Sequence, residues 1–167
     1  MLRSPRKAPT YLSETASFKQ YLDYYTQRAG LSENKLAIFS RLNQSTLNKI
    51  ANGRLKNVNI SMLICICLAL GLNEAESIDL LSRRERAFSP ANDTHRVYLE
   101  LIRIYSMKKI DYKRLECDSQ CLLEEADAYL KKEGKAPLPN VNIPPQWCGE
   151  TAPCGAQPPL KWCIHSA

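Results

Sequence analysis

The chain has 167 residues, of which 44% are hydrophobic and 24% charged, and it carries a net charge of +6. This composition is typical of a globular protein that is long enough to bury a core. Its longest apolar run, Met62 to Leu70, has nine residues whereas a membrane span needs about 20, so we expect no membrane partner. The N-terminal stretch MLRSPRKAPT is basic and lacks the apolar segment of a signal peptide, which predicts a cytoplasmic protein.

The excess of positive charge lies in the first half of the chain. Residues 18–88 carry ten bases and six acids, whereas residues 89–167 carry ten of each. There is no Asp or Glu between Asn34 and Asn73. The bases in this acid-free interval are Lys35, Arg41, Lys49, Arg54 and Lys56. Such a one-sided charge pattern indicates a localised anionic partner.

The sequence predicts five short helices between residues 14 and 88. Phe18, Leu22 and Tyr25 recur at the spacing of one helix face, and this helix should end at Gly30. The next four helices each follow a residue that can cap the N-terminus, namely Ser32, Asn43, Asn59 and Asn73. The helix after Asn59 is apolar nearly all round, so we expect it to be the central buried helix. Glu76, three positions after Asn73, predicts a capping box.

Three of the asparagines admit a second interpretation. Asn43, Asn59 and Asn92 each begin an Asn-x-Ser/Thr triplet, which is also the acceptor for glycosylation. Capping is favoured because each triplet lies at the start of a predicted helix.

A second helical region follows Ser89-Pro90. Residues 94–107 have two apolar stripes, one formed by Val97, Leu101 and Ile104 and the other by Tyr98, Ile102 and Tyr105. One neighbour cannot cover two stripes, so we expect this helix to hold a dimer or at least a second core. A further amphipathic helix should end at Gly134. From Lys135 the sequence has seven prolines and no helical period, which predicts an irregular tail rich in Pro and Cys.

The acid-free interval contains the arrangement that a helix-turn-helix needs. Two short helices, Ser32 to Phe39 and Asn43 to Asn52, are joined by only three or four residues. If Leu47 and Ile50 face inward, the second helix exposes Gln44, Ser45, Asn48 and Lys49. Gln and Asn can bond adenine, and Lys can donate to guanine, whereas a carboxylate would be repelled by phosphates. The pattern predicts that this helix lies in the major groove of DNA.

The segment LSENKLAIFSRLNQSTLNKIANGR, with NISMLICICLALGL after it, resembles the Cro/C1-type (XRE family) helix-turn-helix domain of bacterial and phage repressors. The resemblance covers about half of the chain, roughly residues 14–88. The matching residues are Leu36, Ala37, Gln44, Thr46, Leu47, Ile50, Asn52, Gly53, Leu63, Ile66, Ala69, Leu70 and Gly71. It implies an all-α fold: a five-helix Cro/C1 (lambda repressor-like) helix-turn-helix bundle, then two to three further helices and the irregular tail.

The resemblance also implies a function and a set of contacts. The chain would be a sequence-specific, repressor-like regulator that binds double-stranded DNA as a homodimer. The base-contacting residues would be Gln44, Ser45, Asn48 and Lys49, and the backbone-contacting residues would be Lys35, Arg41, Arg54 and Lys56. Arg41 takes the turn position that usually holds Gly, so we expect a positive φ there and a side chain that reaches phosphate.

The predicted domain organisation has four parts: a basic arm (1–13), the helix-turn-helix domain (14–88), a helical extension (91–134) and the Pro/Cys-rich tail (135–167). The segment SIDLLSRRERAFSP and the helices after it more loosely resemble a set of bacterial XRE-type regulators with such an extension. The alternative function is that of an adaptor, in which a helix-turn-helix fold binds protein or RNA and the extension docks an unknown protein partner.

The sequence gives little support for an enzyme, a cofactor or a metal site. Only two histidines occur, His95 and His165, and no nucleophile, nucleotide or metalloprotease motif is present. Cys117 and Cys121 are spaced as neighbours on a helix, but no second pair completes a zinc site. The remaining alternative is a Cys3His set in the tail, formed by Cys148, Cys154, Cys163 and His165, whose spacing fits no compact zinc knuckle.

Overall fold

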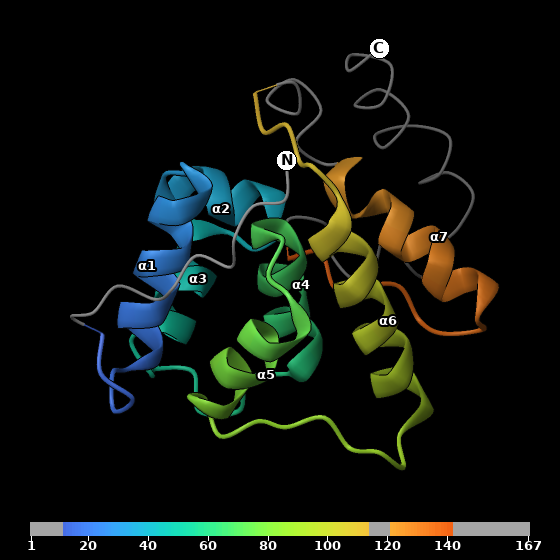
Figure 1. The fold of residues 1–167 in the computed structure, drawn as a ribbon, viewed down its shortest axis with the longest axis horizontal. Helices are drawn as coiled ribbons and strands as arrows, with labels where there is room; N and C mark the ends of the chain where they lie inside the picture. Colours follow the sequence, from blue (N-terminus) through green and yellow to red (C-terminus); the bar gives the residue numbers. More distant parts are fainter. Residues whose placement is uncertain (1–11, 114–120, 142–167) are drawn as a thin grey trace.

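A computed structural model describes residues 12–113 and 121–141 of the chain (Figure 1). These residues form only helices and connections, with no strand among them, which confirms the predicted all-α class. The helices are α1 (Phe18–Ala29), α2 (Glu33–Phe39), α3 (Gln44–Ala51), α4 (Ile60–Leu70), α5 (Glu74–Ser82), α6 (Asp93–Met107), the 3-10 helix η2 (Cys121–Leu123) and α7 (Glu124–Lys132). In the described part of the chain, no helix combines the length and apolarity of a membrane span.

Local side-chain chemistry sets the helix starts. The Asn43 side chain accepts from the Thr46 amide at 2.7 Å, and Asn59 and Asn92 cap α4 and α6 in the same way. At Asn73 the capping box with Glu76 is present, as the sequence predicts. Each cap satisfies an amide that the first helical turn leaves without a partner. All three triplet asparagines are therefore N-caps.

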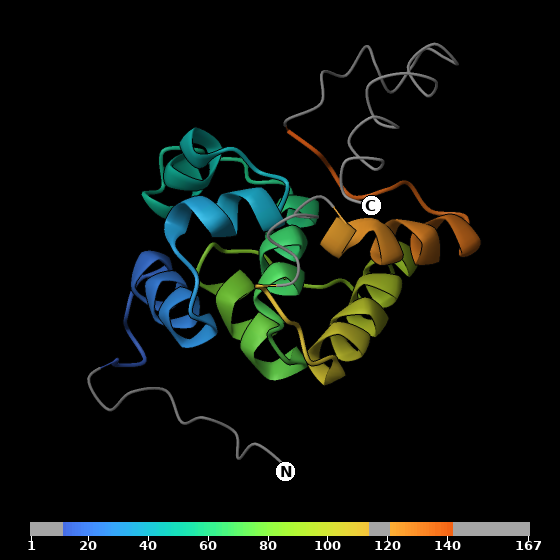
Figure 2. The same cartoon turned by 90° about the horizontal axis from the view of Figure 1, so that it is seen from above.

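Helix α4 is the centre of the molecule. All eight residues from Leu63 to Leu70 are buried, so no side of the helix after its first turn faces solvent. In Figure 1 α4 stands between α1 and α5 on one side and α6 on the other. The view from above agrees, because α6 and α7 lie across α4 from α1 and α3 (Figure 2). The prediction of a central buried helix is confirmed.

The region after Pro90 belongs to the same core. Val97, Leu101 and Ile102 on α6 are each at most 1% exposed, and they form one hydrophobic cluster with the core residues of α1 to α5. The Tyr105 hydroxyl donates to the Leu122 carbonyl at 2.7 Å and accepts from the Ala126 amide at 3.1 Å. Both stripes of α6 are thus covered within the chain except at Ile104, which is 39% exposed. They form no second core and give no argument for a dimer, which stays a prediction.

The first residues of the predicted tail are also packed. Residues 135–141 form no helix, yet Leu138 is only 4% exposed. The Val141 amide donates to the Arg41 carbonyl at 2.9 Å, which ties this segment to the connection between α2 and α3. Structurally the described tail is therefore part of the folded core. The rest of the tail, which contains the cysteines and the histidine of the alternative Cys3His set, lies outside the described residues.

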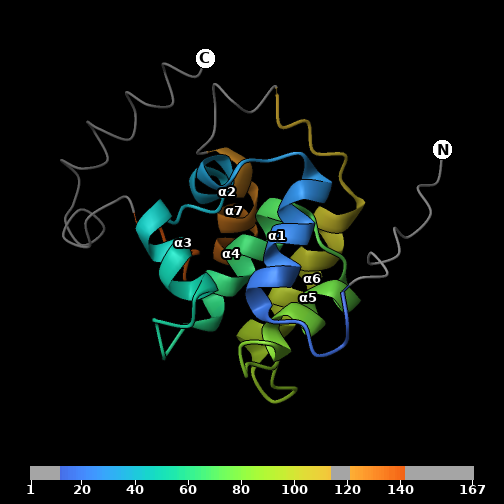
Figure 3. The ribbon, with the colours of Figure 1, turned by 90° about the vertical axis from the view of Figure 1, so that its left-hand side faces the viewer.

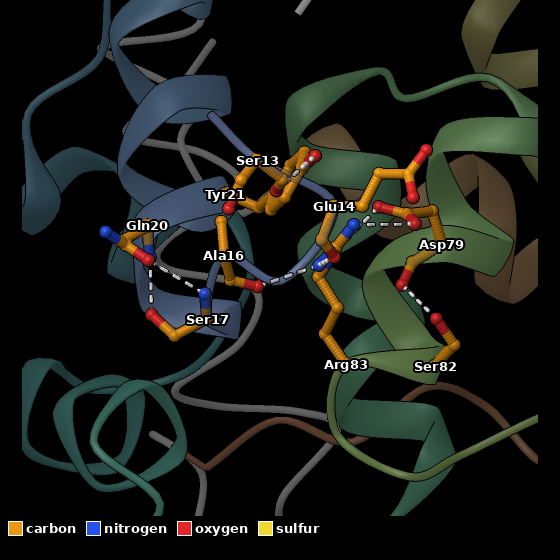
Figure 4. A network of polar contacts seen from close by, with 9 residues as sticks. All are labelled: Ser13, Glu14, Ala16, Ser17, Gln20, Tyr21, Asp79, Ser82 and Arg83. Carbon is orange, nitrogen blue, oxygen red and sulfur yellow. Dashed lines mark hydrogen bonds and ion pairs between the residues drawn. The ribbon is translucent and has the colours of Figure 1, made fainter. Parts of the chain in front are cut away.

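Arg83 joins the start of α1 to the end of α5 (Figure 4). Its guanidinium donates to the carbonyls of Glu14 and Ala16, both at 2.7 Å, and to the Asp79 carboxylate at 2.9 Å. The same guanidinium lies 3.8 Å from the centre of the Tyr21 ring. Four groups thus surround one half-buried cation, and α1 is fixed across α5.

Helix α6 completes the core. Its buried residues should therefore contribute as much to the free energy of unfolding as the buried residues of the helices before Pro90. Leu101→Ala removes a side chain that is 1% exposed, so it should lower the free energy of unfolding by about 2–5 kcal/mol. Ile104→Ala, on the same helix but 39% exposed, is the matched control and should cost under about 1 kcal/mol. Equal costs in urea unfolding would contradict the single-core description.

Candidate functional site

Helices α2 and α3 are joined by the four-residue connection Ser40–Asn43. Arg41 has φ 61°, as the sequence predicts for this position, and the Leu42 amide donates back to the Ala37 carbonyl at 3.0 Å. The left-handed residue ends α2 sharply and lets the chain turn into α3. Figure 3 views this side of the molecule, where α3 lies at the edge of the bundle below α2.

Helix α3 has one inward and one outward face. Leu47 is 1% exposed and Ile50 is fully buried, so both point into the core. Gln44, Ser45 and Lys49 are exposed, as predicted, and Asn48 is half-buried at the border between the two faces. The outward face therefore presents an amide, a hydroxyl and an ammonium group within two helical turns.

The loop after α3 folds back on the end of that helix. The amides of Arg54 and Leu55 both donate to the Lys49 carbonyl, at 2.9 and 3.2 Å. The Arg84 guanidinium, from the segment after α5, donates to the Leu55 carbonyl at 2.5 Å. Arg54 and Lys56 are exposed on this fixed loop. Their charges are thus held close to the outward face of α3.

The positive charge of this surface is not neutralised within the described structure. Lys49, Arg54 and Lys56 form no ion pair with any described residue. Elsewhere bases are paired with acids, as in Lys19–Asp23, Arg28–Glu76, Arg83–Asp79, Arg96–Glu100 and Arg103–Glu74. An unneutralised set of bases on a rigid surface attracts an anion.

Arg41 does not belong to this surface, which corrects the prediction that it reaches phosphate. It is only 6% exposed, and its guanidinium forms an ion pair with Asp127 of α7. The physical reason is that α7 brings a carboxylate beside the turn, and a buried cation needs such a partner.

Burial raises the pKa of the Cys65 thiol, which lies near Arg41, to about 12, so the Cys65 thiol stays neutral at pH 7.

Arg86 joins the candidate surface, although it was not predicted to do so. A depression of about 420 Å³ is lined by Asn57, Val58, Asn59, Ile60, Arg86, Ala87 and His95. Arg86 therefore lies beside the loop that carries Lys56, and it forms no ion pair with a described residue. The sequence signal is the run SRRER, in which Arg83 and Arg84 are engaged with backbone carbonyls and Arg86 is not.

The contacts of His95 hold the segment before α6 in place. Its Nδ1 accepts from the Ser89 amide at 2.9 Å, and its ring stacks on Tyr98 with the centroids 6.2 Å apart. Among the described residues no group of three or more His, Cys, Asp or Glu is placed to hold a metal ion. The side chains of Cys117 and Cys121 lie outside the described part.

No protein-family model, curated protein or solved structure matches the chain. The candidate surface therefore rests on its own geometry: the outward face of α3, the loop after it, and the bases Lys49, Arg54 and Lys56 without acidic partners in the described structure.

Proposed function

We propose that this protein is a sequence-specific DNA-binding regulator that inserts α3 into the major groove, with two copies on a two-fold operator. The observation that carries the proposal is the outward face of α3, where Gln44, Ser45 and Lys49 are exposed beside bases that no described acid neutralises. A sequence interval without any carboxylate, from Asn34 to Asn73, surrounds this face. Repulsion between carboxylates and phosphates gives a physical reason for that absence.

The chemistry of the face suits base readout. An exposed Gln can accept from and donate to the two groups that adenine presents in the major groove, and Lys can donate to guanine. Gln44 is the first residue of α3 and Ser45 the second, so both lie at the end of the helix that reaches deepest in helix-turn-helix complexes. Asn48, half-buried one turn later, would contact a base beside that of Gln44.

The remaining bases suit contacts with phosphate. Lys35, Arg54 and Lys56 are exposed, and the last two lie on a loop whose backbone is held by the Lys49 carbonyl and Arg84. A fixed loop places its charges without the entropy loss of ordering it on binding. We add Arg86 to this set because it shares the depression beside the loop. These contacts would supply affinity and register but no sequence information.

An adaptor that binds protein or RNA through the same face is the alternative. It would use the exposed residues of α3 for a different partner, and it predicts no preferred DNA duplex. Selection from a pool of random duplexes with the purified protein separates the two functions directly.

Binding to duplex DNA should depend strongly on salt. Each copy would neutralise about four phosphates, so the logarithm of the affinity of one copy for a half-site should fall with a slope of about −3.6 against the logarithm of the salt concentration. Between about 50 and 200 mM salt the affinity should therefore drop on the order of a hundred-fold. Arg54→Ala should reduce the slope by about one, whereas Gln44→Ala should leave it unchanged. An affinity that does not respond to salt would contradict DNA binding through this surface.

Gln44 and Arg54 should have different roles in recognition. Gln44→Ala should weaken binding to the preferred duplex by about 1–3 kcal/mol and relax discrimination at one base position, because a base contact is lost. Arg54→Ala should weaken preferred and random duplexes by the same factor, since a phosphate contact carries no sequence information. Both side chains are exposed, so the melting temperature should barely change in either variant.

Matched controls are available on other helices. Gln27→Ala on α1 removes an exposed amide and Lys132→Ala on α7 removes an exposed cation, and both should leave binding unchanged. If Gln44→Ala and Arg54→Ala gave the same profile over a panel of duplexes, the assignment of Gln44 to base readout would be wrong.

A further inference from the structure

The turn before α3 is tied to the C-terminal part of the chain through one residue, Arg41. Arg41, only 6% exposed, pairs through one guanidinium nitrogen with the Asp127 carboxylate, although the two residues are 86 positions apart. Within the described structure its Nε has no hydrogen-bond partner, so Asp127 is the group that compensates this buried charge. Charge compensation at this depth is strong because little water screens it.

Asp127 also organises the segment that follows α7. Its second carboxylate oxygen accepts from the Leu138 amide at 2.9 Å. Three residues later the Val141 amide donates to the Arg41 carbonyl, also at 2.9 Å. The side chain and the backbone of Arg41 are therefore both held from the C-terminal side, and Asp127 takes part directly in one of these contacts and indirectly in the other.

The contacts of Arg41 with Asp127 and Val141 lie at the point where α3 begins. Arg41 is followed by Leu42, which is fully buried, and by Asn43, which caps α3. Helix α3 has only eight residues and lies at the edge of the bundle, so the position of its first turn determines the tilt of the whole helix. Gln44 and Ser45 stand in that first turn. Base readout tolerates displacements of only about 0.5 Å.

We propose that Asp127 is a positioning residue for DNA readout: through Arg41 it sets the angle at which α3 presents Gln44 and Ser45 to the bases. The inference rests on the DNA-binding function proposed above and adds a role for α7. The extension then contributes to sequence discrimination without touching DNA, and any displacement of α7 changes the selectivity of α3.

Two single variants and their combination test this role. Asp127→Asn keeps the shape of the side chain but removes the charge, and Arg41→Gly removes the cation while relieving the strain of a positive φ. In both, the ratio of the affinity for the preferred duplex to that for random duplexes should fall about tenfold, while the affinity for random duplexes stays within about twofold. The double variant should be no worse than the worse single variant, because both remove one coupling.

A second measurement, hydrogen exchange, needs no DNA. Hydrogen exchange of the Leu42 and Thr46 amides should become faster in both variants, more than any change in global stability explains. Asp23→Asn is the matched control, because Asp23 forms an exposed ion pair with Lys19 on α1. It should change neither the selectivity nor the exchange of these amides. A purely structural role would lower the melting temperature and leave the selectivity ratio of the folded protein intact.

The outcomes separate the two proposals. If the wild-type protein has a preferred duplex and the folded variants keep its selectivity ratio, the positioning role of Asp127 is wrong and the DNA-binding function stands. If the wild-type protein prefers no duplex, the DNA-binding function itself is wrong, and the positioning role is wrong with it. Should Asp127→Asn fail to fold, Arg41→Gly decides alone, because a glycine suits the backbone at this turn.

Discussion

The burial of α4 on every side is the constraint on which the rest of the structure depends. A helix whose residues 63–70 are all buried cannot lie at the surface of a bundle, so it needs neighbours all round. Helices α1, α2 and α5 supply one side, and α6 with η2 supplies the other. The helical extension (residues 91–134) is thus required because α4 is apolar on every side, and without the extension an apolar face of α4 would meet water.

This packing explains why the candidate surface and the extension are connected. Once α6 covers α4, α7 and the segment after it run beside the connection between α2 and α3, where Asp127 meets Arg41. One base of the acid-free interval is thereby used inside the protein. Lys49, Arg54 and Lys56 remain exposed and form no ion pair with a described residue, on a helix end and a loop fixed by backbone hydrogen bonds.

Much of the fold follows from local signals in the sequence. The caps at Asn43 and Asn59 depend on neighbours within three residues, and the inward Leu47 and Ile50 follow from helical spacing, so both were predictable. The outward face of α3 was predictable too, because it consists of the positions that do not share the inward side with Leu47 and Ile50. What covers the stripes of α6 was not predictable, because the number of apolar faces does not say whether a neighbour in the same chain or a second copy meets them.

The errors at the site have a similar cause. Arg41 has the same residue type and sequence surroundings as the exposed bases, and its partner is 86 residues away in a helix with several acids. The sequence does not single out Arg86, because a run of arginines after a helix does not reveal which of them bond carbonyls. Both assignments depend on tertiary contacts, which neither periodicity nor local charge encodes.

The most direct test of the account is to map backbone amide chemical shifts of the full chain as its preferred duplex is added. We predict that the largest changes fall on residues 43–57, the outward face of α3 and the loop after it, with smaller changes on α6 and α7. Changes centred on α6 and α7, or a weak uniform change with every duplex tested, would contradict the claim that α3 reads DNA.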